Sequence, residues 1–406
     1  MTNSWVFFDR DDQPTFAQRA LAERMMDTER VVLVGRGVSV MRKRTFPRLE
    51  TRCRVLPGVK GCFQYQPLFL PQRVWGFGRL MKWLNCYLLR AELDTLIGGD
   101  SARMVIYDSP TQDCLAGTLG ESHTVYLAID DRTVTVSGEA IRGDLEAERR
   151  LLRKVHQVIC VSETLAEVLR SRMAPDGQKP IHVLPNGYDE RIFDPQKTWD
   201  EPATLRSLPR PRVLVAGYVS ERIDWEGVEA VVKCRPEWTW VFVGPAERGM
   251  REKIECLAVR VAAAGRKSVT PASVWHEPVP ASQIPAFIAH SDACAMPYRM
   301  NAFTRCSSPV KPIEYLAMGM PVLSTRVPAL EKYGGVVQWV NQGDGHSYAL
   351  ALDHLAATRG DAKLREARLA AVAGDTWASR AVRFRELVLD GVTESEGASL
   401  ARKTET

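Results

Sequence analysis

The sequence predicts an α/β protein built from two Rossmann-like domains. Short apolar runs alternate with segments of helical periodicity along the chain, which is typical of parallel sheets covered by helices. The alternation stops at a polar, proline-spaced stretch and then begins again. The chain of 406 residues is also longer than one hydrophobic core usually serves, and its 45% hydrophobic and 25% charged residues are ordinary for a globular protein.

In the first half, apolar and β-branched runs predict strands, and segments with a period of 3.6 predict helices between them. Ser162 precedes an acidic first turn and is expected to cap the helix that follows it. The predicted strands are 5–8, 31–34, 104–107, 124–129, 158–161 and 181–184. The predicted helices are 15–26, 79–96, 139–155 and 163–172. Residues 1–195 are therefore expected to form the first domain, followed by a linker over 196–211.

The same alternation in the second half predicts a second domain over residues 212–374. The predicted strands are 212–216, 240–243, 273–276, 293–296, 322–324 and 336–339. The predicted helices are 225–233, 250–264, 282–290, 312–318 and 347–357. A last amphipathic helix is expected within 375–390, and the polar residues 391–406 are expected to form a disordered tail.

Composition narrows the class of protein. No apolar run approaches about 18 residues, and the charged residues at 9–12 leave no room for the apolar core of a signal peptide. The nine cysteines are scattered and form no CxxC pair, which favours reduced thiols over disulfides or a zinc site. We therefore expect a cytoplasmic protein. The acids at 9–12 also resemble a metal-binding DxD motif, but they lack partner histidines, and no metal site is expected.

Residues 41–90 form a basic, aromatic strip, with eleven Lys or Arg residues against one acid. Such a strip suits either an anionic membrane leaflet or a nucleic acid, and a solvated basic face is the plainer alternative. We expect peripheral binding at the inner membrane face and no nucleic acid partner. The residues assigned to this strip are Arg42, Lys43, Arg44, Arg48, Trp75, Arg79, Lys82 and Trp83.

The most informative segment is SSPVKPIEYLAMGMPV at 307–322. Pro312 suits the first turn of a helix, and Gly319 and Pro321 predict its end. Lys311 lies at the helix N-terminus, where a phosphate is favoured, and Glu314 in the first turn can accept hydrogen bonds from a ribose. Together they predict a nucleotide-diphosphate pocket at the carboxyl edge of a parallel sheet.

This segment resembles the donor-binding signature of GT-B glycosyltransferases, above all bacterial family-4-like polysaccharide enzymes of the teichuronic-acid type and the xanthan glucuronosyltransferase. Further segments agree with that family in order along about residues 100–330: VICVSETL at 158–165, LPNGYD at 184–189, VAGYV at 215–219 and SDACAMPY at 291–298. The resemblance implies two Rossmann-like domains that face a central cleft, with a terminal helix that crosses back to the first domain.

The resemblance also implies roles for individual residues. Ser307, Ser308 and Lys311 would bind the diphosphate of a nucleotide sugar, and Glu314 would bind its ribose. Arg222 stands near the position of a phosphate-binding base in the family, and the nucleotide base would lie by His276. From the residues alone, Arg222 can be a solvated or salt-bridged arginine, and Lys311 can be a plain surface lysine. His276 can be a core histidine, and Glu314 can be a helix-stabilising acid.

The chain departs from the retaining family-4 pattern at one position. Cys306 stands eight residues before Glu314, where many retaining enzymes have a second glutamate. In contrast, YLAIDD at 126–131 resembles the strand-end aspartate of the xanthan-type inverting enzyme, which implies Asp130 as the base that deprotonates the acceptor hydroxyl. Asp130 and Asp131 can also be a turn or helix-capping pair.

The sequence therefore predicts a metal-independent, inverting glycosyltransferase without a cofactor, whose donor substrate is a nucleotide-diphosphate sugar. The expected acceptor is a saccharide, lipid-linked and presented at the membrane, in the synthesis of a cell-surface polysaccharide. The alternatives are a sugar-nucleotide epimerase of the same fold and a non-catalytic protein that binds nucleotide sugars or polyanions.

Overall fold

The computed structural model describes residues 3–8, 16–26, 28–35, 38–39, 48–55, 62–70, 78–98, 101–174, 177–263 and 272–404. The chain divides into two compact units. Unit 1 contains residues 1–133, 140–185 and 377–406, and unit 2 contains residues 134–139 and 186–376. The division therefore falls ten residues before the predicted end of the first domain, and the predicted linker 196–211 lies within unit 2. In the described parts, no helix is both long enough and apolar enough to cross a membrane.

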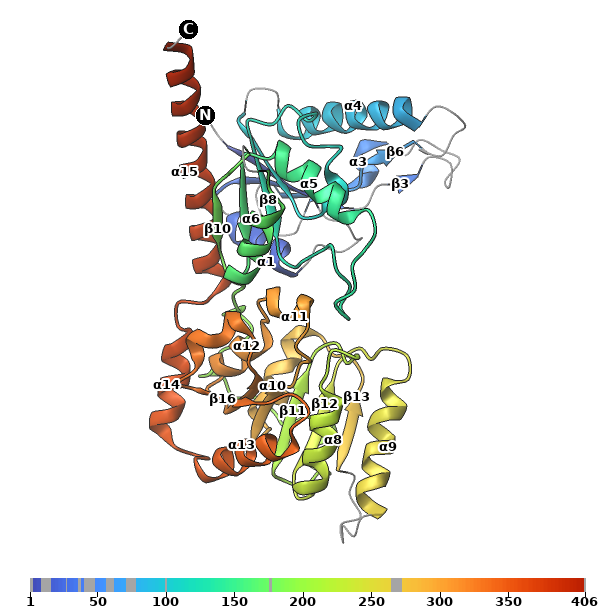
Figure 1. The fold of residues 1–406 in the computed structure, drawn as a ribbon, viewed down its shortest axis with the longest axis vertical. Coiled ribbons are helices and arrows are strands. Elements are labelled where there is room, and N and C mark those ends of the chain that lie inside the picture. The colour runs from blue at the N-terminus through green and yellow to red at the C-terminus, as the bar shows by residue number, and fades with distance from the viewer. Residues whose placement is uncertain are drawn as a thin grey trace. The chain divides into compact units, whose positions relative to one another are not determined.

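Unit 1 is built on an eight-stranded sheet with the strand order β10-β9-β8-β7-β1-β2-β5-β4 (Figure 1). All neighbouring strands are parallel except β4 and β5. The long strands are buried along their whole length, as expected for a sheet covered by helices on both faces. The strands are β1 (Ser4–Phe8), β2 (Arg30–Val34), β4 (Cys53–Val55), β5 (Cys62–Tyr65), β7 (Arg103–Tyr107), β8 (His123–Ala128), β9 (Gln157–Cys160) and β10 (Ile181–Val183), beside a separate pair, β3 (Val38–Ser39) and β6 (Leu68–Phe69).

The helices of unit 1 are α1 (Phe16–Met25), α3 (Leu49–Arg52), α4 (Gly78–Ile97), α5 (Asp144–Lys154), α6 (Glu163–Arg172) and α15 (Trp377–Thr404), with a 3-10 turn η1 (Pro110–Gln112). Helix α6 has the predicted bounds, and the Ser162 hydroxyl accepts a hydrogen bond from Leu165 N as expected of a cap. Helix α5 begins five residues later than predicted, because residues 133–141 form a loop in which Ile141 N donates to Thr133 O.

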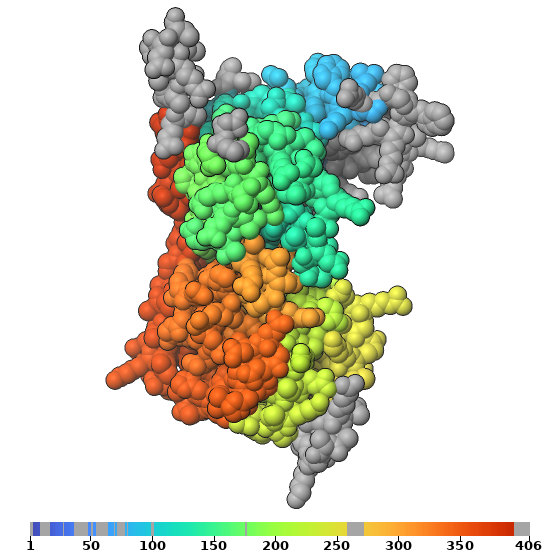
Figure 2. Space-filling view, in the orientation of Figure 1, coloured from blue at the N-terminus to red at the C-terminus, as the bar shows by residue number. Residues whose placement is uncertain are grey.

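The terminal helix α15 belongs to unit 1, as predicted. Phe384 is fully buried, and its ring lies 6.1 Å from that of Trp5 and 5.9 Å from that of Phe7. Figure 2 shows this helix, in red, along the green segment that contains β9 and β10, and Gln157 at the start of β9 donates to Leu387 O. The prediction of a disordered tail is wrong for residues 391–404, because the helix continues to Thr404.

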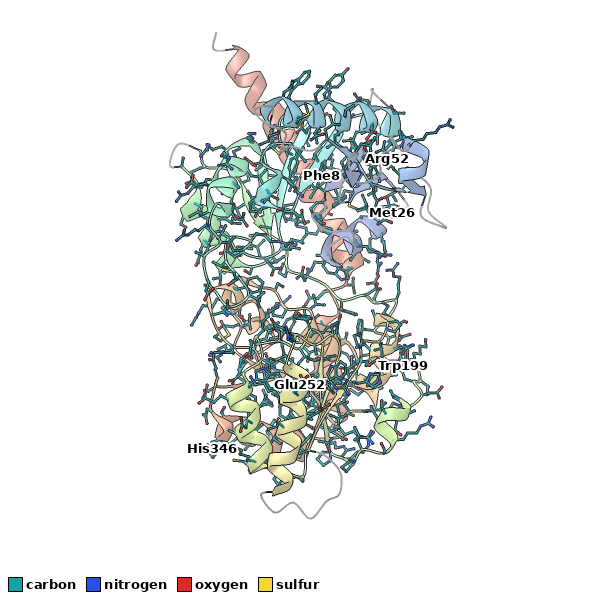
Figure 3. The ribbon with its side chains drawn as sticks, turned by 90° about the vertical axis from the view of Figure 1, so that its right-hand side faces the viewer. Phe8, Met26, Arg52, Trp199, Glu252 and His346 are labelled. Carbon is teal, nitrogen blue, oxygen red and sulfur yellow. The ribbon has the colours of Figure 1, made fainter. Side chains whose placement is uncertain are left out.

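Helix α4 contacts the edge of the same sheet that is formed by β5 and β4. The buried Arg52, labelled in Figure 3, pairs with Glu92 of α4, and Tyr65 at the end of β5 donates to the same carboxylate. The Arg52 guanidinium also donates to Gln66 O at 2.9 Å. Arg52 therefore holds α4 in place and takes no part in an exposed basic strip.

Unit 2 is built on a six-stranded, fully parallel sheet with the order β13-β12-β11-β14-β15-β16. Its strands are β11 (Arg212–Ala216), β12 (Thr239–Val243), β13 (Ser273–His276), β14 (Ala293–Met296), β15 (Val322–Thr325) and β16 (Val337–Val340). The strand order reverses between β11 and β14. Ligands of doubly wound sheets bind at such a switch point, beyond the carboxyl ends of the strands.

The helices of unit 2 are α7 (Ala203–Arg206), α8 (Trp225–Cys234), α9 (Met250–Ala263), α10 (Ile284–Ala289), α11 (Ala302–Cys306), α12 (Lys311–Ala317), α13 (Gly345–Ala357) and α14 (Ala362–Val372), with 3-10 turns η2 (Ala281–Gln283) and η3 (Pro328–Tyr333). Helix α14 was not predicted. Its N-cap is Asp361, whose carboxylate accepts hydrogen bonds from Lys363 N and Leu364 N.

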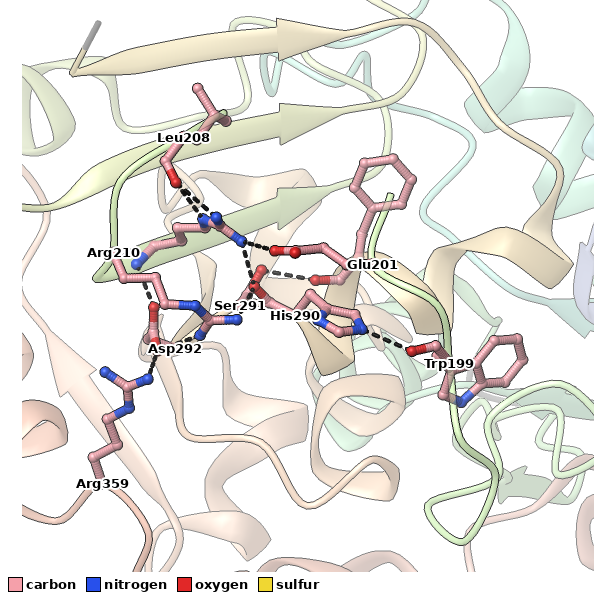
Figure 4. Close-up of polar contacts among 10 residues, drawn as sticks. Trp199, Glu201, Leu208, Arg210, His290, Ser291, Asp292 and Arg359 are labelled. Atoms are coloured by element: carbon pink, nitrogen blue, oxygen red, sulfur yellow. Dashed lines mark hydrogen bonds and ion pairs between the residues drawn. The ribbon is translucent and has the colours of Figure 1, made fainter. Parts of the chain in front are cut away.

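Residues 199–212 are fixed to unit 2 by a buried acid. Asp292, which precedes β14, accepts from Arg210 at 2.7 Å and from Arg212 N at 2.7 Å, and it also pairs with Arg359 (Figure 4). The Arg212 side chain pairs with Glu201 at 2.6 Å. These contacts explain why the polar stretch that resembles a linker packs as part of unit 2.

Candidate functional site

The predicted donor residues gather at the switch point of unit 2. Arg222 lies in the loop after β11, whereas Ser307, Ser308, Lys311 and Glu314 follow β14. The two loops therefore flank the crevice between the two strands, where the strand order reverses. Tyr315 of α12 joins them, because its hydroxyl accepts a hydrogen bond from Ala216 N at 2.9 Å.

Two glycines allow the loops to approach each other closely. Gly217 has a φ of 133°, and a Cβ atom there would lie 3.6 Å from Cε of Lys311. Gly244, which follows β12, has a φ of 140°, and a Cβ atom there would lie 2.1 Å from Gly217 O. Both conformations favour glycine, and the second position has no room for a side chain. Lys311 therefore lies against bare backbone at the end of β11.

Lys311 and Glu314 contact each other directly. The Lys311 ammonium donates to Glu314 Oε2 at 2.7 Å, and the lysine side chain is 29% exposed whereas the glutamate side chain is 3% exposed. An ammonium has three donors, so Lys311 can keep this bond and still bind a phosphate oxygen. The buried Glu314 carboxylate is thus paired with a cation in the first turn of α12.

Arg222 is held by aromatic rings. Its guanidinium lies 4.5 Å from the ring centroid of Tyr298 and 5.0 Å from that of Phe303. Its Nε atom is buried without a hydrogen-bond partner, and within the described residues no carboxylate pairs with it. The alternative of a salt-bridged arginine is therefore disfavoured. A guanidinium stacked on rings in this way keeps its donors available for an anion.

The two serines build the loop through their own hydrogen bonds. Ser307 Oγ donates to Thr304 O at 2.8 Å at the end of α11. Ser308 Oγ accepts from Asn186 N at 3.2 Å, and the Asn186 amide donates to Ser308 O at 2.8 Å. Both serines are buried, so their side chains fix the shape of the loop. Asn186 belongs to the turn at 184–189, whose role the sequence left open.

His276 lies apart from the Lys311 pair. Its ring meets Phe287 edge-on at 5.0 Å, and its Nδ1 lies 2.7 Å from Glu277 O. The side chain lines a cavity of about 440 Å³ together with Trp199 and Val279. Only its carbonyl, which accepts from Gly244 N at 3.2 Å, reaches the glycine pair. The histidine side chain is half-buried at the wall of this cavity, so it is not a core histidine, and it lies away from Lys311.

In unit 1, Asp130 follows β8 and is half-buried. Its neighbour Asp131 is buried and accepts two hydrogen bonds from Arg172, at 3.0 and 2.8 Å, as well as two from Thr133. Burial acts to raise the pKa of Asp131, but the bonds from Arg172 and Thr133 outweigh it and leave that pKa below its usual value. Arg172 also pairs with Glu148 at 2.6 Å. Asp131 is thus a structural anchor of unit 1.

Sequence reasoning missed Asp108, which follows the neighbouring strand β7. It is fully buried, its Oδ1 accepts from Gln112 at 2.8 Å, and its Oδ2 lies 3.8 Å from the Arg132 guanidinium. Aspartate directly after a predicted strand was the available signal, as it was for Asp130.

Gly244 and the rings around Arg222 were also missed. The glycine-proline pair after a predicted strand was a signal for Gly244. No sequence pattern predicts that Arg222 stacks on Phe303.

Comparison with known structures identifies the fold. An E. coli trehalose-6-phosphate structure bound with UDP-2-fluoro glucose matches with a TM-score of 0.71 and 12% identity, over 95% of this chain and 99% of that one. A sucrose-phosphate synthase from Thermosynechococcus elongatus matches with a TM-score of 0.67 and 15% identity, over 95% of this chain and 98% of that one. The fold is GT-B.

Sequence comparison agrees with the GT-B fold. The model of the family Glycosyl transferases group 1 matches residues 210–358, which lie within unit 2. A Bacillus subtilis (strain 168) protein assigned to teichuronic acid biosynthesis as the glycosyltransferase TuaH is 23% identical over 225 residues, which are 55% of this chain and 54% of that protein. The chain thus spans about half the length of this curated relative.

The matched region contains the residues gathered at the switch point of unit 2: Gly217, Arg222, Ser307, Ser308, Lys311, Glu314 and Tyr315. The placement of the predicted donor site in unit 2 therefore depends on no residue of unit 1. Among the described side chains of both units, no group of three or more His, Cys, Asp or Glu residues is arranged to hold a metal ion.

Proposed function

We propose that this chain is a glycosyltransferase that moves a sugar from a nucleotide-diphosphate donor to a saccharide acceptor in polysaccharide biosynthesis. The observation that carries the proposal is the cation pair at the switch point of unit 2. Lys311 lies against the backbone of Gly217, and Arg222 is stacked on two rings without a carboxylate partner among the described residues. The GT-B fold and the match to the group 1 family support the same class of reaction.

The chemistry follows from the charge that develops as the sugar leaves. Negative charge grows on the diphosphate while the bond to the anomeric carbon breaks, and preorganised cations stabilise that charge. Lys311 and Arg222 would bind the diphosphate oxygens, and the buried Glu314 carboxylate would accept hydrogen bonds from the ribose hydroxyls. We expect these two cations to replace a divalent metal ion in this step.

We further propose an inverting reaction in which Asp130 takes the proton of the acceptor hydroxyl as that oxygen attacks the anomeric carbon. Cys306, buried at the end of α11, stands where the resemblance expects the glutamate of retaining enzymes, which supports this choice. One solved neighbour, a trehalose-6-phosphate synthase, is described as transferring glycosyl groups with retention, so the stereochemistry needs its own measurement. The anomeric configuration of the product, determined by NMR, decides it: retention contradicts Asp130 as the sole base.

A nucleotide-sugar panel tests the function. A true donor at 100 times its dissociation constant is expected to stabilise the protein by about 2.7 kcal/mol. Adding extracts of lipid-linked saccharides should then release free nucleoside diphosphate. Release only with an acceptor supports a transferase, whereas interconversion of the nucleotide sugar without an acceptor supports an epimerase. Binding without either reaction supports a non-catalytic protein.

The lipid-linked acceptor and the peripheral membrane site are also proposals. Arg48 is exposed, whereas Arg42, Lys43, Arg44 and Trp75, together with the side chain of Arg79, lie outside the described residues. Each basic residue near an anionic leaflet is worth about 1 kcal/mol. We expect the protein to sediment with phosphatidylglycerol vesicles at low salt but not with neutral vesicles. The variant with Arg42, Lys43, Arg44 and Arg48 changed to Ser should stay in the supernatant. Equal sedimentation of the variant and the parent would contradict this site.

A further inference from the structure

The exposed face of α4 borders a cavity of unit 1. Its volume is about 630 Å³, which is within the range of small-ligand sites. The sequence assigned Lys82 and Trp83 to a membrane strip, but the structure places both in the wall of this cavity. Its lining residues are Lys82, Trp83, Cys86, Tyr87, Arg90, Asp113, Cys114, Thr118, Arg150 and Lys154.

The helix has a buried side and an exposed aromatic side. Leu89 and Leu93 pack into the core, whereas Trp83 is 61% exposed and Tyr87 is 59% exposed. These two rings stack on each other, with centroids 5.8 Å apart and planes inclined by 18°. Large exposed aromatic surface is unusual unless it binds something. Side chains stand away from the outer side of α4 in Figure 3, and in Figure 2 this helix lies on the surface, in blue.

The opposite wall comes from α5 and from the loop after β7. The Arg150 guanidinium pairs with Asp113 at 2.6 Å, and the Lys154 ammonium donates to Asp113 O at 2.6 Å. Cys86 of α4 contacts Cys114 O through its thiol at 3.8 Å, which links the two walls. The contacts with Asp113 hold the Arg150 and Lys154 cations in place.

The cavity is strongly positive. Four cationic side chains and one carboxylate line it, which gives the lining a formal charge of about +3. Lys82 has no carboxylate partner in the described part of the chain, and Arg90 lies only at 4.0 Å from Asp94. The charge complements an anion, and the stacked rings offer a flat apolar platform beside it.

We propose that this cavity binds an acidic segment of the saccharide acceptor, with carboxylates on the Lys82, Arg90 and Arg150 side chains and a sugar ring against the Trp83–Tyr87 platform. The C–H face of a sugar ring packs on an aromatic ring, while cations bind uronate carboxylates. A bilayer is a poorer match, because the cations lie in a concave wall built by two helices and a loop. The inference rests on the proposed function and names the substrate class.

The probe is a fluorescent hexamer of galacturonate, titrated into the full chain at low salt, with maltohexaose as its neutral counterpart. We expect the acidic hexamer to bind at least tenfold more tightly than maltohexaose. The double variant Trp83→Ala/Tyr87→Ala should weaken binding of the acidic hexamer by at least tenfold. Lys82→Gln should weaken it by about threefold to tenfold and should reduce its dependence on salt.

Matched controls lie on the same helices. Leu80 of α4 is 47% exposed but does not line the cavity, so Leu80→Ala should bind as the parent does. Arg149 of α5 pairs with Glu146 outside the cavity, so Arg149→Gln should also bind as the parent does. These changed residues are exposed, so the melting temperature of each variant is expected to match the parent and serves as a check on folding.

Two outcomes overturn the proposal: no binding of the acidic hexamer by the parent, or equal binding by the double variant. A third result would assign the cavity to a membrane surface: the parent binds phosphatidylglycerol vesicles but not the acidic hexamer, and the double variant no longer binds the vesicles. The saccharide assignment would then be wrong. Nucleotide-sugar binding, measured separately, should be unchanged in every variant. If no nucleotide sugar binds while the acidic hexamer does, the proposed function fails and the cavity assignment stands as a saccharide site.

Discussion

At the residue scale, the contact between Lys311 and Glu314 determines how a substitution of either residue changes nucleoside diphosphate binding. Lys311→Ala removes a charge-assisted phosphate contact and leaves a buried carboxylate without its cation. We expect nucleoside diphosphate binding to weaken by about 1.5–3 kcal/mol, which is roughly a 10–150-fold rise in Kd. Isothermal titration measures it. Lys233 is a matched control, because it pairs with Glu229 on α8 at 3.0 Å, and Lys233→Ala should leave Kd unchanged.

The two aspartates after β8 should behave differently. Asp130→Asn keeps the shape of the side chain but cannot accept a proton, so turnover should fall about 10²–10⁴-fold while donor binding and stability stay unchanged. Asp131→Asn weakens the bonds to Arg172 and should lower the melting temperature. Steady-state rates and thermal unfolding separate the two effects. A loss of stability without a loss of rate at Asp130 would reject its role as base.

A buried histidine makes unit 1 sensitive to acid. Burial and the neighbouring His156 ring, 4.8 Å away, lower the pKa of His123 to about 4. In the unfolded chain His123 binds a proton near pH 6.5, whereas in the folded chain it stays neutral down to about pH 4. The folded state therefore loses stability as the pH falls from 6.5 to 4. We expect a loss of about 2 kcal/mol between pH 7 and pH 5 from this group. Urea unfolding measures it: His123→Leu should flatten the pH dependence, and the exposed His346→Gln should not.

At the element scale, α15 completes the core of unit 1. Phe384→Ala removes a fully buried ring from beside Trp5 and Phe7, and such a change costs about 3–5 kcal/mol of unfolding free energy. Val382 on the same helix is 61% exposed, so Val382→Ala should change stability by less than about 0.5 kcal/mol. Denaturant unfolding of the full chain compares the two. Equal effects would show that α15 does not pack as described.

At the scale of the whole molecule, the donor residues all belong to unit 2. Hydrogen exchange of the full chain with excess UDP, and then with other nucleoside diphosphates, is therefore expected to slow at 217–224 and 297–317. Strands β1, β2 and β7 of unit 1 should exchange as before, because they contain none of these residues. Protection confined to unit 1 would contradict the placement of the donor site.

The sequence alone predicted most of the architecture, because buried parallel strands leave continuous apolar runs that are easy to read. The strands of both large sheets except β4 and β5, and most of the helices, follow from these runs and from helical periodicity. Helix α14 and the continuation of α15 to Thr404 were missed, because neither sequence has a clear apolar periodicity and the continuation of α15 contains two glycines, Gly391 and Gly397.

For the site, the sequence determined the segment that holds Lys311 and Glu314, because helix signals and a glycine stop are local in the chain. Tertiary structure alone decided that Lys311 lies against Gly217 and that the guanidinium of Arg222 is stacked on Phe303. Contacts between residues tens of positions apart depend on how the sheet orders its strands. Local sequence patterns do not encode that order, so only the folded chain reveals such contacts.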